Sequence, residues 1–225
     1  MFSRILLASR PDVDGELAAM PALALALKSK ARLRVLEWES ENSLSIRNVL
    51  TRWNLLPDGS KPSDISGLGL AIKKRQARGS YCVTSVAEEA RSKECDLVVL
   101  SSLNTRSWLS RLESRWLGVR PVFRCHCLVT PPGTPGIVDP ATGKWRVTRL
   151  LCCGSGSRAT AASLSQLLDC CEPVIEHCER EECWTRARQL PADLVIFSPR
   201  QQLDLDFLEK TVPHAPCSLL LVPPR

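Results

Sequence analysis

Short apolar runs, separated by segments long enough for helices, constrain the fold of this 225-residue chain more than any other feature. The clearest runs in the first 130 residues are 5–8, 33–36, 97–100 and 128–129. Strands that are apolar along their whole length are buried on both faces, which is typical of a parallel sheet covered by helices. The alternation of strands and helices therefore predicts a doubly wound α/β fold.

Helices fill the intervals between these runs. Residues 14–30 are rich in Ala and Leu and predict a helix, although Pro21 inside it requires either a kink or a later start. The further elements expected before residue 130 are a helix over 43–53, a strand over 70–76, a helix over 83–92 and a helix over 106–118.

Residues 131–145 form the densest stretch of Pro and Gly and predict a linker between one domain over 1–130 and another over 146–225. After the linker the pattern restarts. We expect strands over 147–152, 173–178, 194–197 and 218–222, and helices over 157–171, 179–190 and 202–211.

Two phrases recur in the two halves. Glu94–Ser101 is similar to Pro191–Ser198, and Arg4–Leu7 is similar to Arg149–Cys152. The landmarks lie about ninety residues apart in the first half and fewer than fifty apart in the second. The chain is therefore interpreted as a duplication whose second copy lacks about one strand–helix unit.

These phrases resemble the universal stress protein family. Ala215–Val222 resembles the family phrase that leads into the last strand, and Arg47–Leu56 and Val138–Gly143 resemble a tandem subgroup. The resemblance covers nearly the whole chain. It implies tandem doubly wound parallel sheets in the order 3-2-1-4-5, of the adenine nucleotide alpha hydrolase-like type.

The resemblance also implies how the halves meet. The last strands of the family often pair across a two-fold axis, so we expect residues 125–129 and 218–222 to pair within the chain or to mediate self-association. In the shortened second copy, residues 173–178 serve as the second or the third strand, but not as both.

Many members of the family bind ATP through glycines that follow the fourth strand, where bare backbone approaches the phosphates at the start of a helix. The family also uses an Asp after the first strand. The residues at these positions of the first copy are Ser9, Asn104, Ser107 and a displaced Gly118, and those of the second copy are Gln201 and Asp204. We therefore expect degenerate sites without a cofactor, with ATP as the alternative.

Gly154-Ser155-Gly156-Ser157 follows a predicted strand and opens a predicted helix. Such a turn either cradles a phosphate or is a tight connection with Ser157 as the N-cap. It lacks the full Rossmann spacing and the Walker lysine, so we favour the tight turn. The four residues stay among the candidate nucleotide positions.

Eleven cysteines are expected to be reduced core thiols. Cys125-His126-Cys127, and His177-Cys178 with Cys183, contain ligand types without the usual paired zinc motifs, and the adjacent pair Cys152-Cys153 is poorly arranged for chelation. We expect no metal. With three histidines and no Gly-x-Ser-x-Gly phrase, we also expect no catalytic residue and no enzyme activity.

The formal charge of +6 is compatible with acidic partners but establishes none. The basic run 73–78 is expected to be a solvated surface rather than a nucleic-acid site. No segment approaches the roughly 20 apolar residues of a membrane span, and the apolar run after Met1 is too short for a signal peptide. We expect a cytoplasmic protein.

The sequence thus favours a non-catalytic stress-response or regulatory module that acts through protein contacts. The alternative is a regulator that binds ATP or AMP, with weak hydrolysis or none. A third hypothesis, binding of nucleic acid or an anionic surface, uses the basic residues Lys73, Lys74, Arg75, Arg78, Arg106, Arg111 and Arg115.

Overall fold

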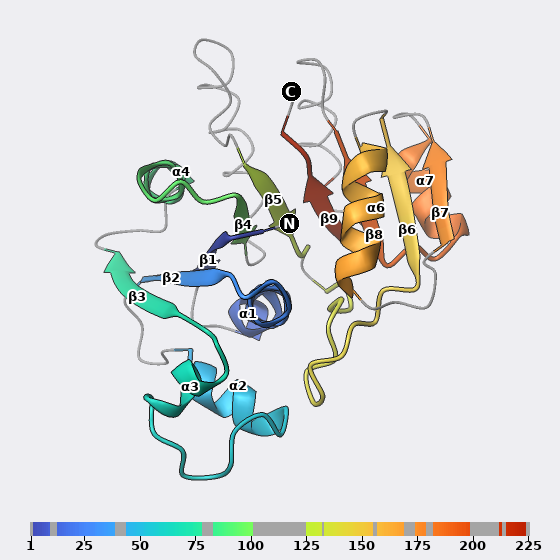
Figure 1. Ribbon diagram of the computed structural model, residues 1–225. Helices are drawn as coiled ribbons and strands as arrows, with labels where there is room; N and C mark the ends of the chain where they lie inside the picture. Colours follow the sequence, from blue (N-terminus) through green and yellow to red (C-terminus); the bar gives the residue numbers. More distant parts are fainter. Residues whose placement is uncertain are drawn as a thin grey trace.

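A computed structural model gives the arrangement of the chain (Figure 1). It describes residues 2–9, 13–38, 44–77, 83–100, 125–131, 133–154, 157–168, 174–178, 182–198, 212 and 215–223. The predicted helices over 106–118 and 202–211 lie outside these residues.

The elements of the first half agree with the predicted order. They are β1 (Arg4–Ser9), α1 (Val13–Ser29), β2 (Arg32–Trp38), α2 (Ile46–Arg52), α3 (Asp64–Gly67), β3 (Ile72–Ala77), α4 (Val83–Ser92), β4 (Leu97–Leu100) and β5 (His126–Val129). Those of the second half are β6 (Arg149–Cys153), α6 (Ser157–Leu168), β7 (Val174–Cys178), α7 (Cys183–Gln189), β8 (Leu194–Phe197) and β9 (Ser218–Leu221).

The nine described strands form a single sheet in the order β3-β2-β1-β4-β5-β9-β8-β6-β7. The first five reproduce the expected 3-2-1-4-5 order. In the second half β7 pairs with β6 in parallel, so it takes the position of the second strand. No described strand lies beyond β7, where a third strand would stand, which accounts for the shorter second half.

The halves join where β5 and β9 pair antiparallel, with Leu128 opposite Leu220. The last strands therefore pair within the chain, one of the two expected arrangements. β5 also pairs with β4, and β9 with β8, so neither strand offers a free backbone edge. Self-association through residues 125–129 and 218–222 stays a prediction, and it would have to use their side chains. The predicted domain boundaries also stay predictions.

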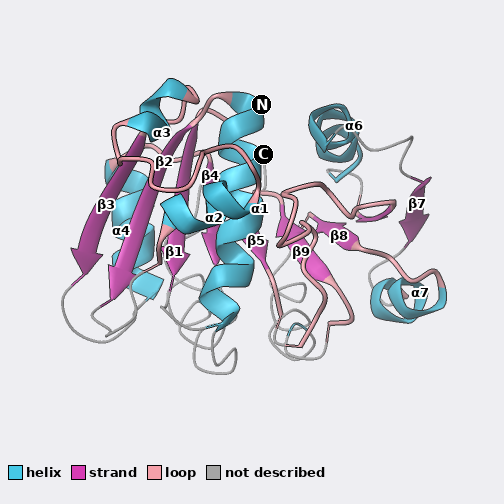
Figure 2. Cartoon of the chain, turned by 90° about the horizontal axis from the view of Figure 1, so that it is seen from below, coloured by secondary structure: helices cyan, strands magenta, loops and turns pink. Residues whose placement is uncertain are grey.

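Helices cover both faces of the sheet. Figure 1 shows α1 and α4 on opposite sides of the first half, and Figure 2 shows α6 and α7 on opposite sides of the second. Side chains alternate accordingly, because Ile5 and Leu7 pack in the cluster with α1 and α6, whereas Leu6 and Ala8 pack in the cluster with α4 and α7. Both clusters contain residues of both halves, so the core is continuous across the β5–β9 junction.

Helix α1 resolves the question raised by Pro21. The helix begins at Val13 and includes Pro21, so the later start is wrong. Pro21 is buried, and so are the small residues Ala18 and Ala22 beside it. Burial of this apolar segment against the sheet offsets the hydrogen bond that proline removes.

An aspartate links the two recurring phrases in each half. Asp96 accepts hydrogen bonds from the backbone N–H groups of Ser3 and Arg4, at 2.7 and 3.1 Å. Asp193 does the same for Thr148 and Arg149, at 2.7 and 2.9 Å. The carboxylate before the fourth strand thus fixes the start of the first strand, which explains why the phrases recur together.

The segment between the halves folds onto α2. Asp139 Oδ1 accepts hydrogen bonds from the N–H groups of Ala141 and Thr142, at 2.8 and 2.9 Å, and the carboxylate also pairs with Arg146. Residues 138 and 145 form an antiparallel bridge that closes the loop. The predicted linker is therefore an ordered hairpin-like loop.

Trp53 anchors this loop. Its Nε1 donates to the carbonyl of Pro140 at 3.2 Å. A Cβ added at Gly143 would lie 2.5 Å from Cδ2 of the same ring, and Gly143 also has φ of +71°. The two segments that resemble the tandem subgroup, 47–56 and 138–143, are therefore in direct contact with one another.

None of the described helices combines the length and the apolar character that crossing a bilayer requires.

Candidate functional site

The topology defines two candidate crevices. In open parallel sheets, ligands bind beyond the carboxyl ends of the strands, where the strand order reverses. Here the order reverses between β1 and β4 in the first half, and between β6 and β8 in the second. The predicted nucleotide positions follow these four strands, so the two reversals are where a nucleotide would be expected.

The first crevice is described on one side only. Ser9, the last residue of β1, is 1% exposed and lies opposite Glu37 of β2. Its burial leaves almost none of the side chain accessible to a ligand. The other predicted positions of the first half, Asn104, Ser107 and Gly118, lie outside the described residues.

The second crevice is described only at its base, where the ends of β6 and β8 meet. The N–H of Ser198, just after β8, donates to the carbonyl of Cys153 at 3.1 Å, which extends the β6–β8 ladder. Gly154 has φ of +83°, and a Cβ there would lie 3.1 Å from the Ser198 carbonyl oxygen. The two strand ends are thus in close contact, and the tight approach together with the positive φ favours glycine at position 154.

Ser157 is already engaged in the turn that follows. It is the first residue of α6 and is fully buried. Its Oγ donates to the carbonyl of Gly154 at 2.5 Å, and its N–H donates to the same oxygen at 3.2 Å. Ser157 is therefore the first helical residue and not the N-cap that the sequence predicts, and its hydroxyl donates back to a carbonyl. Ser155 and Gly156 lie outside the described residues.

Three cysteines meet on one face of the sheet near the same edge. The sulfurs of Cys153, Cys178 and Cys183 all lie within 4.8 Å of one another. Cys153 and Cys178 end the neighbouring strands β6 and β7 and are opposite one another in register, and Cys183 is the first residue of α7. Hydrogen bonds that the Cys183 thiol donates to Cys153 and Cys178, together with burial, raise the pKa of Cys183 far above its usual value.

Only two of these three cysteines are near neighbours along the chain. Cys178 and Cys183 are separated by four residues, and their thiols are metal-ligand types. Cys153 adjoins Cys152, and an adjacent pair of this kind predicts poor chelation. The pairing of β6 with β7 brings Cys153 to Cys178, and only the strand order could have revealed it.

Other described thiols behave as core residues. Cys125 and Cys127 are buried on one face of the sheet, as their alternation predicts. Burial raises the pKa of Cys125 to about 12 and that of Cys217 to about 12. His126, between the first two, points to the other face, where its ring meets the Phe2 ring edge-on at 5.4 Å.

The basic run lies mainly on β3, a strand at the edge of the sheet. Lys74 Nζ lies 3.2 Å from Glu37 Oε1, and Arg75 pairs with the buried carboxylate of Glu89. Arg34 approaches Glu89 at 3.7 Å from the neighbouring strand. Part of the run thus balances acidic groups of strand β2 and helix α4. Charged side chains on an edge strand also oppose edge-to-edge aggregation.

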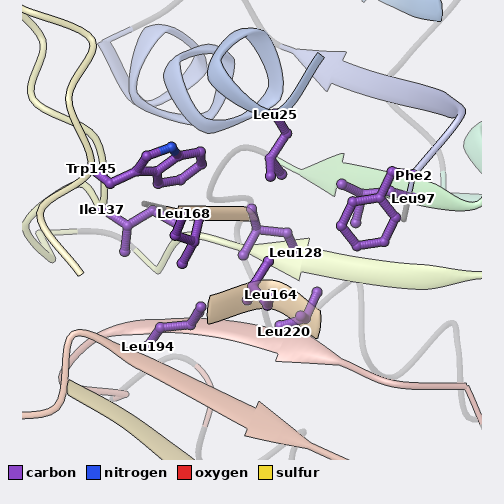
Figure 3. Close-up of a pocket in the computed structure, with 10 residues that line it drawn as sticks. All are labelled: Phe2, Leu25, Leu97, Leu128, Ile137, Trp145, Leu164, Leu168, Leu194 and Leu220. Atoms are coloured by element: carbon purple, nitrogen blue, oxygen red, sulfur yellow. The ribbon is translucent and has the colours of Figure 1, made fainter. Parts of the chain in front are cut away.

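An apolar cavity lies where the halves join, but it is too small for a ligand. Figure 3 shows Leu128 and Leu220 from the junction strands beside Leu25 of α1 and Leu164 of α6. Its volume is about 10 Å³, which corresponds to at most one water molecule. It is a packing gap in the shared core.

Comparison with known proteins identifies the fold. No protein-family model matches the chain, and no curated protein matches it. Among solved structures, a functionally unknown protein of Pseudomonas aeruginosa PAO1 is 13% identical, covering 99% of this chain and 93% of its own, with a TM-score of 0.61. A universal stress protein of Archaeoglobus fulgidus DSM 4304 is 7% identical, covering 98% and 96%, with a TM-score of 0.56.

The chain has the universal stress protein fold. A protein of P. aeruginosa UCBPP-PA14, described as a candidate universal stress protein, gives a TM-score of 0.63 at 13% identity, covering 99% of this chain and 94% of its own. At such identities the likeness establishes the fold alone.

Proposed function

We propose that this chain is a universal stress protein-type regulatory module that acts through contacts with other proteins and catalyses no reaction. The observation that carries the proposal is the close contact at the base of the second crevice, where the N–H of Ser198 bonds to the carbonyl of Cys153 and the Ser198 carbonyl lies against Gly154. Backbone N–H groups bind a phosphate when they are free of other partners. The N–H of Ser198 is already engaged by Cys153.

The composition of the site supports the same proposal. The hydroxyl of Ser157 is committed to the carbonyl of Gly154, and Ser9 is buried at the end of β1. Neither presents a free donor to a phosphate. In the first half, Asn104 and Ser107 carry side chains where the family pattern has glycine, and side chains limit the approach of backbone N–H groups.

The alternative is a regulator that binds ATP or AMP with weak hydrolysis or none. It would use the first crevice, between β1 and β4, because the described donors of the second, the Ser198 N–H and the Ser157 hydroxyl, are engaged by backbone carbonyls. The two functions differ in one measurable property, which is whether millimolar nucleotide stabilises the folded chain.

Thermal unfolding with and without Mg-ATP tests the proposal. A site with a dissociation constant of about 10 μM would, at about 1 mM ATP, stabilise the fold by about 2.7 kcal/mol. For a chain of this size that gain raises Tm by roughly 5–10 °C. We expect no such shift with ATP, ADP or AMP.

The control for the net charge of +6 is inorganic triphosphate with Mg²⁺ at equal ionic strength. A shift produced equally by triphosphate and ATP reports non-specific attraction and leaves the proposal standing. A shift of several degrees that requires the adenosine moiety contradicts it and establishes the nucleotide-binding alternative.

A further inference from the structure

The three cysteines near the carboxyl edge of the second half form an arrangement that the proposed function does not use. Cys153, Cys178 and Cys183 come from two strand ends and the start of a helix, and their sulfurs lie within 4.8 Å of one another. Among the described residues no other group of three metal-ligating side chains comes this close. Pairing of β6 and β7 sets the position of two sulfurs, and α7 supplies the third.

We propose that the sulfurs of Cys153, Cys178 and Cys183 bind one thiophilic metal ion, Cu⁺ or Zn²⁺, as three thiolates. Thiolate ligands select these soft or borderline ions over Mg²⁺ and Ca²⁺. With a metal–sulfur bond of about 2.3 Å, three thiolates around one ion lie about 3.8–4.0 Å apart. The sulfurs need to approach one another by at most about 1 Å to reach this geometry.

The surroundings suit a metal site as well as a thiol core. Cys153 is 1% exposed and Cys183 fully buried, in the cluster that also holds Trp184 and Phe197, so water has little access to the bonds that would form. Cys178 is only half-buried and provides the route by which an ion enters. The site therefore combines an apolar interior with one accessible donor.

Binding conserves electrons and releases protons. Each thiol gives up its proton as its sulfur bonds to the ion, so three protons leave for one ion bound and no redox step is needed. The resulting centre carries a net charge of −1 with Zn²⁺ and −2 with Cu⁺. Burial favours the centre with the smaller charge, which is the Zn²⁺ centre. The three described donors instead suit Cu⁺, because structural zinc takes four ligands. The experiment separates the two ions.

The test uses the full chain, freed of metal and kept reduced with a reductant that is not a thiol. One arm titrates Zn²⁺ against a chromogenic zinc chelator, and the other titrates Cu⁺ without oxygen against a chromogenic Cu⁺ chelator. We expect one ion per chain in at least one arm, and the tighter arm identifies the ion. Cys178→Ala and Cys183→Ala should each weaken binding by about 100-fold or more, because loss of a direct ligand exceeds the 10–100-fold cost of outer-shell changes.

The matched control is Cys217→Ala, which removes a buried thiol from the same face and the same half. It should bind the ion as the unmodified chain does. Thermal unfolding without metal shows which variants fold. If Cys183→Ala does not fold, Cys178→Ala still decides the test, because Cys178 is only half-buried. The proposal is overturned if the unmodified chain competes with neither chelator. It is also overturned if Cys178→Ala binds the ion with unchanged affinity, or if binding remains when all three cysteines are replaced.

Discussion

At the scale of single residues, His126 shows how burial decides a protonation state. Burial lowers its pKa, and a contact between its Nδ1 and the backbone carbonyl of Asp96 at 3.4 Å offsets part of this effect. The folded chain therefore holds a neutral imidazole against Phe2 at a pH where an unfolded chain begins to take up a proton.

This gives the first prediction, a loss of stability in mild acid. Below a pH of about 6.5 the unfolded chain binds a proton that folded His126 resists, so the free energy of unfolding falls as the pH falls. Urea unfolding at pH 7.5 and 5.5 should show a larger loss for the unmodified chain than for His126→Phe, which keeps an aromatic ring beside Phe2. Equal losses of stability in the two proteins contradict the assignment of this pH dependence to His126.

The second prediction concerns Gly143. Comparison with Gly133 separates the cost of its backbone conformation from the cost of its close contact with Trp53. Gly143→Ala adds both left-handed strain and a clash with the Trp53 ring, whereas Gly133→Ala at φ of +70° meets nothing within 4 Å. We expect Gly133→Ala to cost about 1–2 kcal/mol of stability and Gly143→Ala about 2–4 kcal/mol.

Chemical denaturation of the two glycine variants measures the difference. Tryptophan emission compared between the two variants adds an independent reading, since only Gly143→Ala must displace the Trp53 indole from Pro140 and the other five tryptophans are common to both. If the two variants unfold at the same denaturant concentration, the loop between the halves does not pack on α2 as described.

At the scale of elements, Asp96 and Asp193 occupy equivalent positions in the two halves. Each carboxylate accepts two backbone N–H groups at the start of its first strand, and each also accepts a hydroxyl, from Ser3 at 2.8 Å and from Thr148 at 2.9 Å. The same set of bonds thus occurs at the start of β1 and at the start of β6, while the duplication itself stays a prediction.

The third prediction follows from these bonds. Asp96→Ala and Asp193→Ala should each lower the free energy of unfolding by about 1–3 kcal/mol, because N–H groups lose a charged acceptor. Asp58→Ala, in an exposed turn, is the control and should stay within about 0.5 kcal/mol of the unmodified chain. Effects of Asp96→Ala and Asp193→Ala no larger than that of the control count against this role.

Sequence patterns predicted which residues form helices and strands better than they predicted which of these elements lie in contact. Runs such as Leu97–Leu100 and Leu194–Phe197 are apolar on both faces, and both are fully buried strands. Whether residues 173–178 formed the second or third strand could not be decided, because the partner of a strand is a long-range property. The thiol cluster and the backward bond of Ser157 were missed for the same reason, since both depend on which strand ends meet.

At the scale of the whole molecule, two unequal halves share one sheet and one core. Leu128 and Leu220 lie opposite one another at the junction, and α1 of the first half contacts α6 of the second. The cavity that Leu128 and Leu220 line there has a volume of only about 10 Å³, room for at most one water molecule. A junction of this kind predicts that the halves unfold together.

Amide hydrogen exchange on the native chain, at two protein concentrations, tests most directly whether β5 and β9 join the two halves into one sheet within a single chain. Amides of β5 and β9 should exchange as slowly as those of the central strands β1 and β6, and dilution should not change their rates, because the pairing lies within one chain. Fast exchange in β5 and β9, or protection there that is lost on dilution, would contradict a single intramolecular sheet.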